Sequence, residues 1–292
     1  MLKLFWNTTN TDNLKNQKWG EFHKENTSNW LYSLLRDIQF EEVTSLHSVK
    51  ADDKLIIVDS EVQEKDSFYS KLQFICKKVY LFHLGDETGE DVKKIYNFCN
   101  HTWRFFCYNF YFSSKNISCI PIGYKAGVKN YTSRYDNKKK YKWSFIGTIH
   151  KSSRHDLLYQ LETADPFFVH TTEKFNDEKG ISADEISTKL SQTAFAPCPN
   201  GVVHPETYRL YEALECGCIP IVEDSYNYYD RFFPNNPFLK INKWEDAKSI
   251  ISEYSEKKIL AKSKECFDWW INLKLDIKNS ITKKLMEQEP NV

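Results

Sequence analysis

The sequence predicts an α/β protein built from two domains, each carrying a parallel sheet. Short apolar runs, among them 54–59 and 142–147, alternate with segments of helical periodicity, as is typical of βαβ units. The stretch 134–142 is polar, charged and without apolar periodicity, which indicates a linker or an exposed loop. We therefore expect an N-terminal domain over residues 1–137 and a C-terminal domain over residues 138–292.

The N-terminal domain is expected to contain one amphipathic helix and several buried strands. Periodicity predicts the helix over 30–40, with Ser28 or Asn29 as its N-cap. Continuous apolar runs are the signature of parallel strands covered on both faces. The expected strands and the closing segment of this domain lie at 2–6, 54–59, 78–84 and 116–124.

The C-terminal domain is expected to repeat this alternation. A helix is predicted over 154–161, and the tail from Lys257 onward is predicted to be helical, with aromatic side chains on one side. The expected strands of this domain lie at 142–147, 166–170, 193–196 and 218–222.

The segment 195–224 is the most informative part of the chain. It predicts a strand, a polar loop, a short helix, a glycine turn and a second buried strand. Pro205 suits the first turn of the helix and Gly217 suits its C-terminal end. Such a unit places a helix N-terminus at the carboxyl edge of a parallel sheet, where open α/β sheets bind ligands.

Three charged side chains share the polar face of this helix and could bind a nucleotide diphosphate. The helix N-terminus itself favours anions, and the guanidinium of Arg209 matches phosphate oxygens. Glu206 or Glu212 could accept hydrogen bonds from ribose or sugar hydroxyls. By spacing alone, an ordinary surface helix with a Glu206–Arg209 ion pair is the favoured explanation of the pattern.

The run from Tyr208 to Val222 reads Tyr-Arg-Leu-Tyr-Glu-Ala-Leu-Glu-Cys-Gly-Cys-Ile-Pro-Ile-Val. It resembles the donor-binding segment of exostosin-like glycosyltransferases. With the preceding Glu-Thr and the following Glu-Asp, it is most similar to the ribitol-phosphate xylosyltransferase branch of that group. The resemblance implies the GT-B fold, in which two Rossmann-like domains face an interdomain cleft, and it implies a nucleotide-sugar donor.

Candidate catalytic residues follow the strand at 78–84. The run from His83 to Glu87 resembles the His-Leu-x-Asp-Glu run of the same branch, although Gly85 and Asp86 also favour turns for local reasons. An inverting transferase needs a base within reach of the acceptor hydroxyl. Asp86 is the first candidate for this base and Glu87 the second, while His83 is expected to orient or support them.

Further donor contacts are predicted around the first strand of the C-terminal domain. Gly147 would let the backbone approach a diphosphate, and Arg154 would neutralise part of its charge. Asn200, with Gly201, forms either a simple turn or a contact to the donor. The aromatic run 103–112 reads as core, with Arg104 as its exceptional member.

Composition excludes several other classes. Lys+Arg and Asp+Glu both number 40, so the zero net charge argues against a nucleic-acid-binding protein. The eight cysteines lack the spacing of a zinc site. No Asp-x-Asp triplet ends a strand, which disfavours a metal-dependent GT-A mechanism; neither a metal nor another cofactor is expected besides the nucleotide-sugar co-substrate.

The sequence also predicts where in the cell the protein is found. No apolar run approaches 18 residues, so no transmembrane segment is predicted, and residues 1–6 are too short for a signal-peptide core. We expect a cytoplasmic protein, compatible with peripheral association with a membrane or a synthesis complex.

The predicted function is therefore metal-independent, inverting transfer of a sugar from a nucleotide donor, with UDP expected. By resemblance the sugar is xylose and the acceptor a ribitol phosphate, or another glycan of a surface polysaccharide or glycoconjugate. A retaining enzyme is a weaker alternative, because such enzymes pair glutamates eight positions apart whereas Glu206 and Glu212 are six apart. A non-catalytic subunit that binds a nucleotide or a glycan is the other alternative.

Overall fold

The computed structural model describes residues 1–8, 19–90, 93–111, 114–128, 138–174 and 177–287. The chain forms two compact units, Met1–Ile122 together with Asp276–Val292, and Gly123–Leu275. The units divide after Ile122, whereas the sequence placed the boundary after residue 137. That position and most of the expected linker, residues 129–137, lie outside the described part of the chain.

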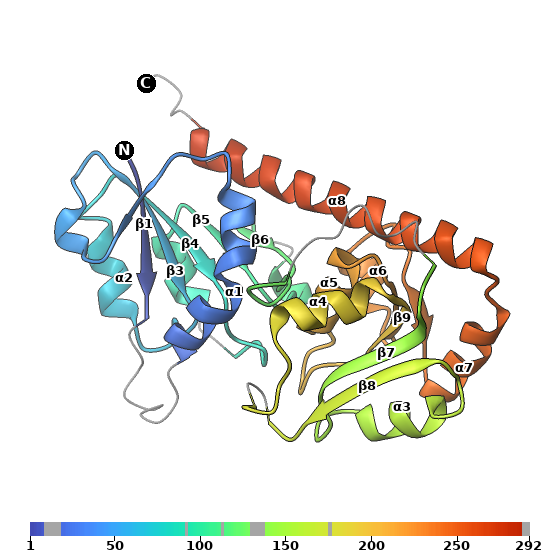
Figure 1. The fold of residues 1–292 in the computed structure, drawn as a ribbon. Coiled ribbons are helices and arrows are strands. Elements are labelled where there is room, and N and C mark those ends of the chain that lie inside the picture. The colour runs from blue at the N-terminus through green and yellow to red at the C-terminus, as the bar shows by residue number, and fades with distance from the viewer. Residues whose placement is uncertain (9–18, 91–92, 112–113, 129–137, 175–176, 288–292) are drawn as a thin grey trace. The chain divides into compact units, whose positions relative to one another are not determined.

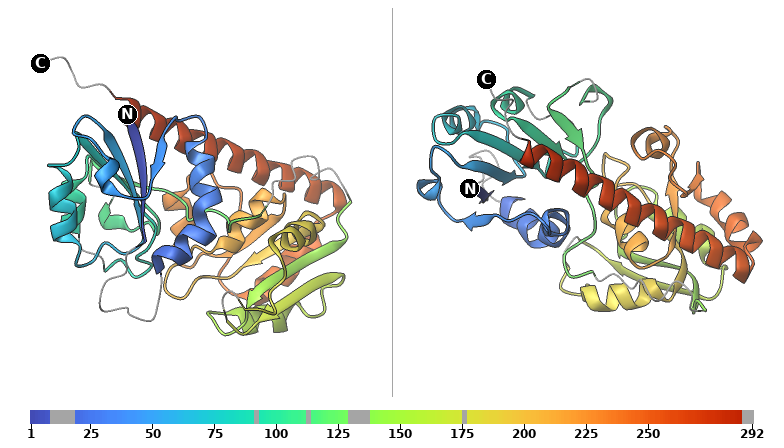
Figure 2. Two further views of the ribbon diagram at one scale, coloured as in Figure 1. Left: turned by 60° about the vertical axis from the view of Figure 1, so that its left-hand side comes forward. Right: turned by 90° about the horizontal axis from the view of Figure 1, so that it is seen from above.

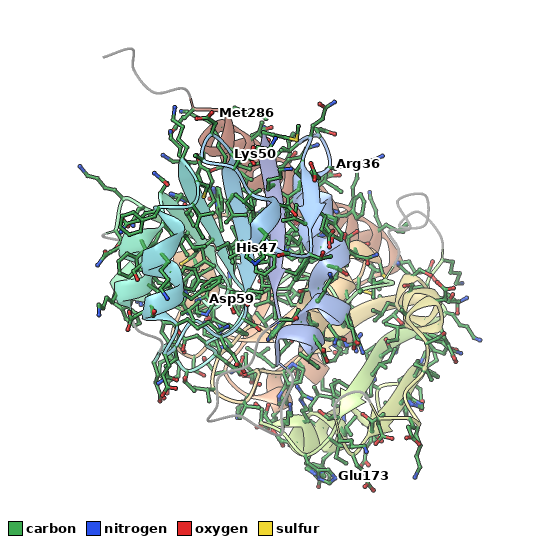
Figure 3. All side chains as sticks on the ribbon, turned by 90° about the vertical axis from the view of Figure 1, so that its left-hand side faces the viewer. Arg36, His47, Lys50, Asp59, Glu173 and Met286 are labelled. Carbon is green, nitrogen blue, oxygen red and sulfur yellow. The ribbon has the colours of Figure 1, made fainter. Side chains whose placement is uncertain are left out.

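A six-stranded sheet forms the centre of the first unit, and all of its pairings are parallel. Its strand order is β2-β1-β3-β4-β5-β6, so the direction of winding reverses between β1 and β3. In Figure 3, Asp59 marks the carboxyl end of β3, and Lys50 lies in the loop that precedes this strand. The strands are β1 (Leu2–Asn7), β2 (Glu41–Val43), β3 (Lys54–Asp59), β4 (Lys78–His83), β5 (His101–Arg104) and β6 (Ile117–Cys119).

Helices cover both faces of this sheet. Because right-handed crossovers on either side of the reversal lead to opposite faces, α1 (Trp19–Leu35) and α2 (Asp66–Leu72) lie on different sides (Figure 2). Short 3₁₀ helices connect other strands. They are η2 (Leu46–Ser48), η3 (Lys93–Phe98) and η4 (Asn109–Tyr111).

The prediction for the first helix was wrong at both ends. Ser28 and Asn29 lie inside α1 and do not cap it. The polar residues just before them remain helical because their side chains bond back to the preceding turn. Asn26 Nδ2 donates to the carbonyl of Phe22 at 2.7 Å, and Thr27 Oγ1 donates to the carbonyl of His23 at 2.6 Å.

A five-stranded parallel sheet in the order β11-β10-β9-β7-β8 forms the centre of the second unit. Winding here reverses between β7 and β9. The expected strands of this unit are all present, whereas the short edge strand β11 was not predicted. The strands are β7 (Tyr141–Thr148), β8 (Phe167–Thr172), β9 (Thr193–Cys198), β10 (Ile219–Glu223) and β11 (Leu239–Ile241).

Helices α4 and α5 lie together on one face of this sheet, and α3 and α7 lie on the other (Figure 1). The helix α3 has the predicted bounds. The helices are α3 (Arg154–Leu161), α4 (Ala183–Ser191), α5 (Tyr208–Glu215), α6 (Tyr228–Phe232) and α7 (Trp244–Glu253).

The long C-terminal helix α8 (Glu256–Met286) confirms the predicted helical tail. Its last residues bond to the first unit, where Lys54 Nζ donates to the carbonyl of Leu285 at 2.6 Å and Tyr80 Oη donates to that of Lys284 at 3.3 Å. Among the described helices, none is both long enough and apolar enough to cross a membrane.

The predicted core character is confirmed for part of the aromatic run and for most of the cysteines, whereas Phe110 is 41% exposed. Trp103 and Phe105 are each 1% exposed. All eight cysteines are free thiols, and seven of them are buried. Burial raises the pKa of six of these thiols, for Cys218 to about 11.

Candidate active-site residues

The carboxyl edge of the second sheet brings together most of the predicted donor-binding residues. Gly147 and Asn200 lie where β7 and β9 end, on the two sides of the point at which the winding reverses. Arg209 Nη2 donates to the carbonyl of Ile146. Arg154 Nη1 donates to both the carbonyl and Oγ1 of Thr148, each at 2.7 Å. Both guanidinium groups are therefore held beside the end of β7.

The helix that carries Arg209 begins later than predicted. Thr207 is its N-cap, so Pro205 and Glu206 precede α5. The predicted end is confirmed, because Gly217 has a φ of +69° and the amide of Cys218 donates to the carbonyl of Ala213 at 2.9 Å.

This shift changes the partner of Arg209. The expected pair with Glu206 is absent among the contacts of the described residues. Instead, Arg209 Nη1 forms an ion pair of 2.6 Å with Glu212 Oε2, one turn further along the helix. The two side chains are 13% and 3% exposed, so Glu212 serves here to hold the guanidinium in place.

Glu206 is engaged by the protein itself. The residue is 2% exposed, and its carboxylate oxygens accept hydrogen bonds from the hydroxyls of Tyr211 and Tyr228, the latter at 2.6 Å. Its backbone amide donates to Nδ1 of His204 at 3.2 Å. Burial of a carboxylate is costly unless hydrogen bonds satisfy it, and the two tyrosines meet that need. A donor that contacts Glu206, as predicted, would therefore have to share these carboxylate oxygens with the two tyrosines.

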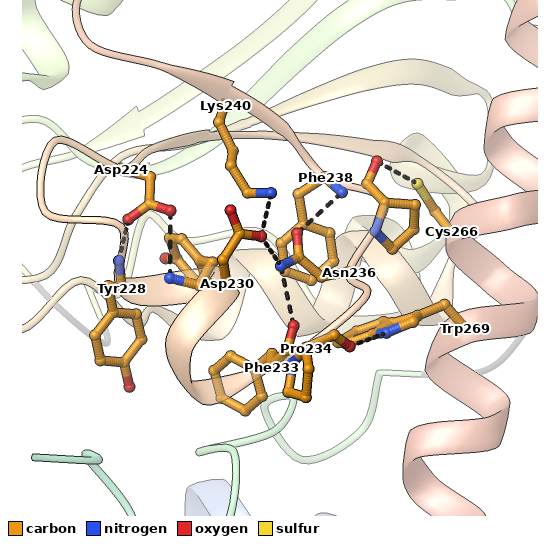
Figure 4. A network of polar contacts seen from close by, with 12 residues as sticks. Asp224, Tyr228, Asp230, Phe233, Pro234, Asn236, Phe238, Lys240, Cys266 and Trp269 are labelled. Atoms are coloured by element: carbon orange, nitrogen blue, oxygen red, sulfur yellow. Dashed lines mark hydrogen bonds and ion pairs between the residues drawn. The ribbon is translucent and has the colours of Figure 1, made fainter. Parts of the chain in front are cut away.

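Asp224 sets the position of one of these tyrosines. Its two carboxylate oxygens accept from the backbone amides of Tyr228 and Tyr229 at the start of α6, as Figure 4 shows. Asp230 and Lys240 form a further ion pair of 2.7 Å beside this turn. Burial raises the pKa of Asp224, while the amide hydrogen bonds oppose the rise. This network fixes the element from which Tyr228 reaches Glu206.

A hydrogen-bonded chain joins four segments at the same edge of the sheet. Trp244 Nε1 donates to Ser153 Oγ at 2.7 Å, and Ser153 Oγ donates to Glu223 Oε2 at 2.6 Å. The same oxygen of Glu223 accepts from the amide of Asn200 at 3.3 Å. Sequence reasoning missed Ser153 and Glu223 as site residues. Together they fix the Asn200 backbone at the start of the loop that leads to α5.

Lys125 is a second residue that the sequence did not indicate by its local pattern. It is half-buried, and the charges of both Glu212 and Arg209 act on it. Burial lowers the pKa of Lys125, Glu212 raises it and Arg209 lowers it. Its position just after the segment 120–124 of the sequence is the one signal that could have drawn attention to it.

The predicted catalytic residues lie on the first unit, after the end of β4. His83 is fully buried, and its Nδ1 lies 2.6 Å from the hydroxyl of Tyr96. Asp86 has a φ of +68°, and its Oδ2 lies 3.0 Å from Nη2 of Arg104. The structure thus joins Asp86 to the residue that stood out in the aromatic run. Glu87 follows in the same turn and is partly exposed.

A buried carboxylate at the neighbouring strand end was not predicted. Asp59 Oδ2 accepts from Asn7 Nδ2 at 2.7 Å and from the hydroxyl of Tyr69 at 2.9 Å, and Lys65 Nζ lies 2.8 Å from Oδ1. Burial raises the pKa of Asp59, while Lys65 lowers it. Figure 3 places Asp59 at the end of β3. This network fixes the chain between β3 and α2, beside the predicted catalytic turn.

Among the described residues, no group of three or more His, Cys, Asp or Glu side chains is arranged to hold a metal ion. The cationic groups described at the carboxyl edge of the second sheet are arginine and lysine side chains.

The fold, with two parallel sheets covered by helices, is of the GT-B class, as the sequence predicted, and solved structures share it. An α1,3-fucosyltransferase shares the fold with a TM-score of 0.53 and 11% identity, over 100% of this chain and 93% of its own. HepE of Anabaena, solved in complex with UDP and glucose, shares it with a TM-score of 0.59 and 10% identity, over 98% and 99% of the two chains.

Within this class, the chain belongs to the family described as the RXYLT1 C-terminal domain, whose model matches residues 124–289. Ribitol-5-phosphate xylosyltransferase 1 of Danio rerio is 26% identical over 168 residues, which cover 51% of this chain and 38% of the relative. The Homo sapiens protein of the same name is 25% identical over 177 residues, covering 52% and 39%. The match thus spans about two fifths of each relative, and the predicted branch is confirmed.

Proposed function

We propose that this protein transfers a sugar from a UDP-sugar to a hydroxyl group of a ribitol-phosphate or related glycan acceptor. The observation that carries the proposal is the carboxyl edge of the second sheet. There, Arg209 and Arg154 are both held at the end of β7, at the reversal of winding where open α/β sheets bind ligands. Two fixed guanidinium groups beside the N-terminus of α5 are suited to a diphosphate.

UDP is the preferred nucleotide on the strength of the structural neighbours. HepE is solved in complexes with UDP and glucose and with UDP-glucose, and it shares this fold over nearly its whole length. Xylose and the ribitol-phosphate acceptor follow from the names of the curated relatives, which match about half of this chain. The choice of sugar and acceptor is therefore proposed by family membership.

The proposed reaction is inverting and needs no metal ion. A carboxylate of the turn Asp86–Glu87 accepts the proton of the acceptor hydroxyl while that oxygen bonds to the anomeric carbon. The bond from this carbon to the diphosphate breaks, and UDP leaves with the electron pair. Arg209, Arg154 and the N-terminus of α5 stabilise the charge that develops on the diphosphate.

Calorimetry with UDP, GDP, CMP and their common sugars tests the donor half of the proposal. We expect selective stabilisation by UDP and by one UDP-sugar, because a ligand at a hundredfold its Kd stabilises a fold by about 2.7 kcal/mol. Mixing the selected donor with a ribitol-phosphate acceptor should then release UDP. Binding of UDP without transfer to any polyol or glycan would instead favour a non-catalytic binding subunit.

A further inference from the structure

The winding of the first sheet reverses between β1 and β3, and a group of buried polar side chains lies at this reversal. The strand β1 ends at Asn7 and β3 ends at Asp59, and these two residues are paired in register. The helices that follow the two strands, α1 and α2, cover opposite faces of the sheet. A reversal of this kind is where open α/β sheets bind ligands, at the carboxyl ends of their strands.

An ion pair between Asp59 and Lys65 forms the centre of this group. The two side chains are 1% and 10% exposed, and Lys65 Nζ lies 2.8 Å from Asp59 Oδ1. The same carboxylate accepts from Asn7 Nδ2, from the hydroxyl of Tyr69 and, at 3.1 Å, from the amide of Glu61. Both oxygens of Asp59 are therefore engaged by the protein, and the pair has no net charge.

Two polar atoms beside this ion pair have no hydrogen-bond partner among the described residues. Ser60 is 6% exposed, and its Oγ is buried and unpaired. Asn7 is 4% exposed; its Nδ2 donates to Asp59, whereas its Oδ1 accepts no hydrogen bond from a described residue. An unpaired buried polar atom lowers the stability of a fold. Two such atoms at the binding edge of a sheet therefore indicate a ligand.

This place adjoins the turn that carries the predicted catalytic carboxylates. The amide of Leu84 donates to the carbonyl of Asp59 at 2.8 Å. The backbone of Ser60 packs directly against Gly85, because a Cβ on Gly85 would lie 1.8 Å from the carbonyl oxygen of Ser60. A compound bound at Ser60 would thus lie beside the turn Asp86–Glu87, within the same unit.

We propose that Ser60 and Asn7 bind the hydroxyl groups of a polyol in the acceptor. This inference rests on the proposed transferase function and names the part of the first unit that recognises the acceptor. Asn7 Oδ1 accepts a hydrogen bond from one hydroxyl group, and Ser60 Oγ donates to or accepts from another. Asp59 is a positioning residue, since it holds the amide of Asn7.

The charges at this place favour a neutral polyol over a phosphate group. The charge of Lys65 is already neutralised by Asp59. A phosphate placed here would also be repelled by the buried Asp59 carboxylate, and such repulsion is strong in a buried site. A hydroxyl group can meet the same donor and acceptor atoms without this cost. The phosphate of a polyol-phosphate acceptor is therefore bound elsewhere.

Urea titration of Ser60→Ala is the first test. Because the Ser60 hydroxyl has no partner in the fold, its removal should leave the urea midpoint unchanged or raise it. Ser144→Ala is the matched control, because Ser144 is fully buried and its Oγ lies 2.9 Å from Oγ1 of Thr193. That variant should unfold at lower urea. A midpoint that falls as far in Ser60→Ala would show that the hydroxyl supports the fold, and would overturn the inference.

Steady-state kinetics with ribitol 5-phosphate as the acceptor is the second test. Ser60→Ala should raise the KM for this acceptor by about three- to tenfold, as expected for loss of one neutral hydrogen bond. The values of kcat and of the KM for the UDP-sugar should stay unchanged, because the hydroxyl contributes to ground-state binding of the acceptor. Ser67→Ala, at an exposed position in α2, should change none of these quantities.

Inhibition of the wild-type protein identifies the group that is recognised and does not depend on any variant. Ribitol should compete with ribitol 5-phosphate, whereas inorganic phosphate at the same concentration should not. If phosphate competes with the acceptor more strongly than ribitol does, the inference is overturned.

The outcomes separate this inference from the proposed function. Absence of transfer by the wild-type protein to any polyol or glycan overturns both. Transfer with the same acceptor KM in Ser60→Ala and in the wild type overturns the inference alone and leaves the proposed function in place.

Discussion

At the scale of single residues, the proposed donor site at the carboxyl edge of the second sheet depends on the position of the Arg209 guanidinium. Arg209 is fixed by the carbonyl of Ile146 on one side and by Glu212 on the other, and it is 13% exposed. A cation fixed in advance stabilises developing charge without reorganisation, which is the main advantage of a built site over a flexible surface lysine. The direction of the Arg209 side chain is thus set by β7 and α5 together.

We predict that Arg209→Ala weakens transition-state stabilisation by about 2–4 kcal/mol, as expected for loss of one fixed donor to a developing anion. The ratio kcat/KM should fall accordingly, and UDP should bind less tightly in calorimetry. Arg36→Ala, an exposed arginine, should change neither quantity. Turnover close to that of the wild type would show that Arg209 does not contact the diphosphate.

Gly85 is a residue at which no side chain fits. A Cβ placed there would lie 1.8 Å from the carbonyl oxygen of Ser60, so the strand ends of β3 and β4 are packed backbone against backbone. The carbonyl belongs to the main chain and cannot turn aside as a flexible side chain would. The Gly-Asp-Glu sequence is therefore required by packing as well as by turn geometry.

We predict that Gly85→Ala lowers the free energy of unfolding by about 1–3 kcal/mol, the usual cost of overpacking a fitted interior. It should also lower kcat, because the turn that carries Glu87 must shift. Urea denaturation followed by circular dichroism measures the first effect. Equal stability of the variant and the wild type would contradict the packing argument.

At the scale of elements, α5 and α6 hold the buried carboxylate of Glu206 between them. Tyr211 comes from α5 and Tyr228 from α6, while Asp224 fixes the start of α6. The segment before α5 is therefore attached to two helices through one side chain. This arrangement explains why Glu206 is a loop residue, although its spacing from Arg209 suits a helix face.

We predict that Tyr228→Phe destabilises the fold by about 1–3 kcal/mol, because a buried carboxylate loses one of its hydrogen-bond donors. The affinity for UDP should also fall, since the loop leading to α5 loses an attachment. Tyr226→Phe provides the matched control, because Tyr226 is 85% exposed. Denaturant titrations of the two variants test this prediction. Equal midpoints would show that the hydroxyl of Tyr228 contributes nothing to the stability of the fold.

The elements also show what local sequence patterns can predict. Buried parallel strands such as β3 and β4 were found because they read as continuous apolar runs. The short elements β2, β11 and α6 were missed because three to five residues carry too little periodicity. The start of α5 was misplaced because Pro205 and Glu206 suit a first turn locally, whereas Glu206 is held by Tyr211 of α5 and by Tyr228 of α6, which is distant in the sequence.

The same limit applies to the site. The residues Arg209, Arg154 and Gly147 could be predicted because each lies next to a strand end or helix start that the sequence already indicated. The pairing of Asp86 with Arg104 could not be, since it depends on β4 and β5 being neighbours in the sheet. Lys125 and Glu223 were missed because their partners are distant in the sequence, and local spacing does not encode such contacts.

At the scale of the whole molecule, stability should depend on pH through two histidines of the first unit, His23 and His101. Burial and the charge of His83 lower the pKa of His23 to about 4. Burial and Lys284 lower that of His101 to about 4, with Glu287 opposing. In the unfolded chain both return to a pKa near 6.5. Between these two pKa values, the histidines of the unfolded chain bind protons that the same histidines do not bind in the folded chain.

We therefore predict that the free energy of unfolding falls as the pH drops from 7 toward 4, by about 2 kcal/mol between pH 7 and pH 5 for His23 alone. Asp59 opposes this trend at the acidic end, because its raised pKa favours protonation of the fold. Urea titrations at pH 7 and pH 5 measure the slope. His23→Gln should flatten it, whereas His47→Gln, at an exposed position, should leave it unchanged. An identical slope in wild type and His23→Gln would mean that His23 is protonated equally in both states, so that its burial does not oppose folding in acid.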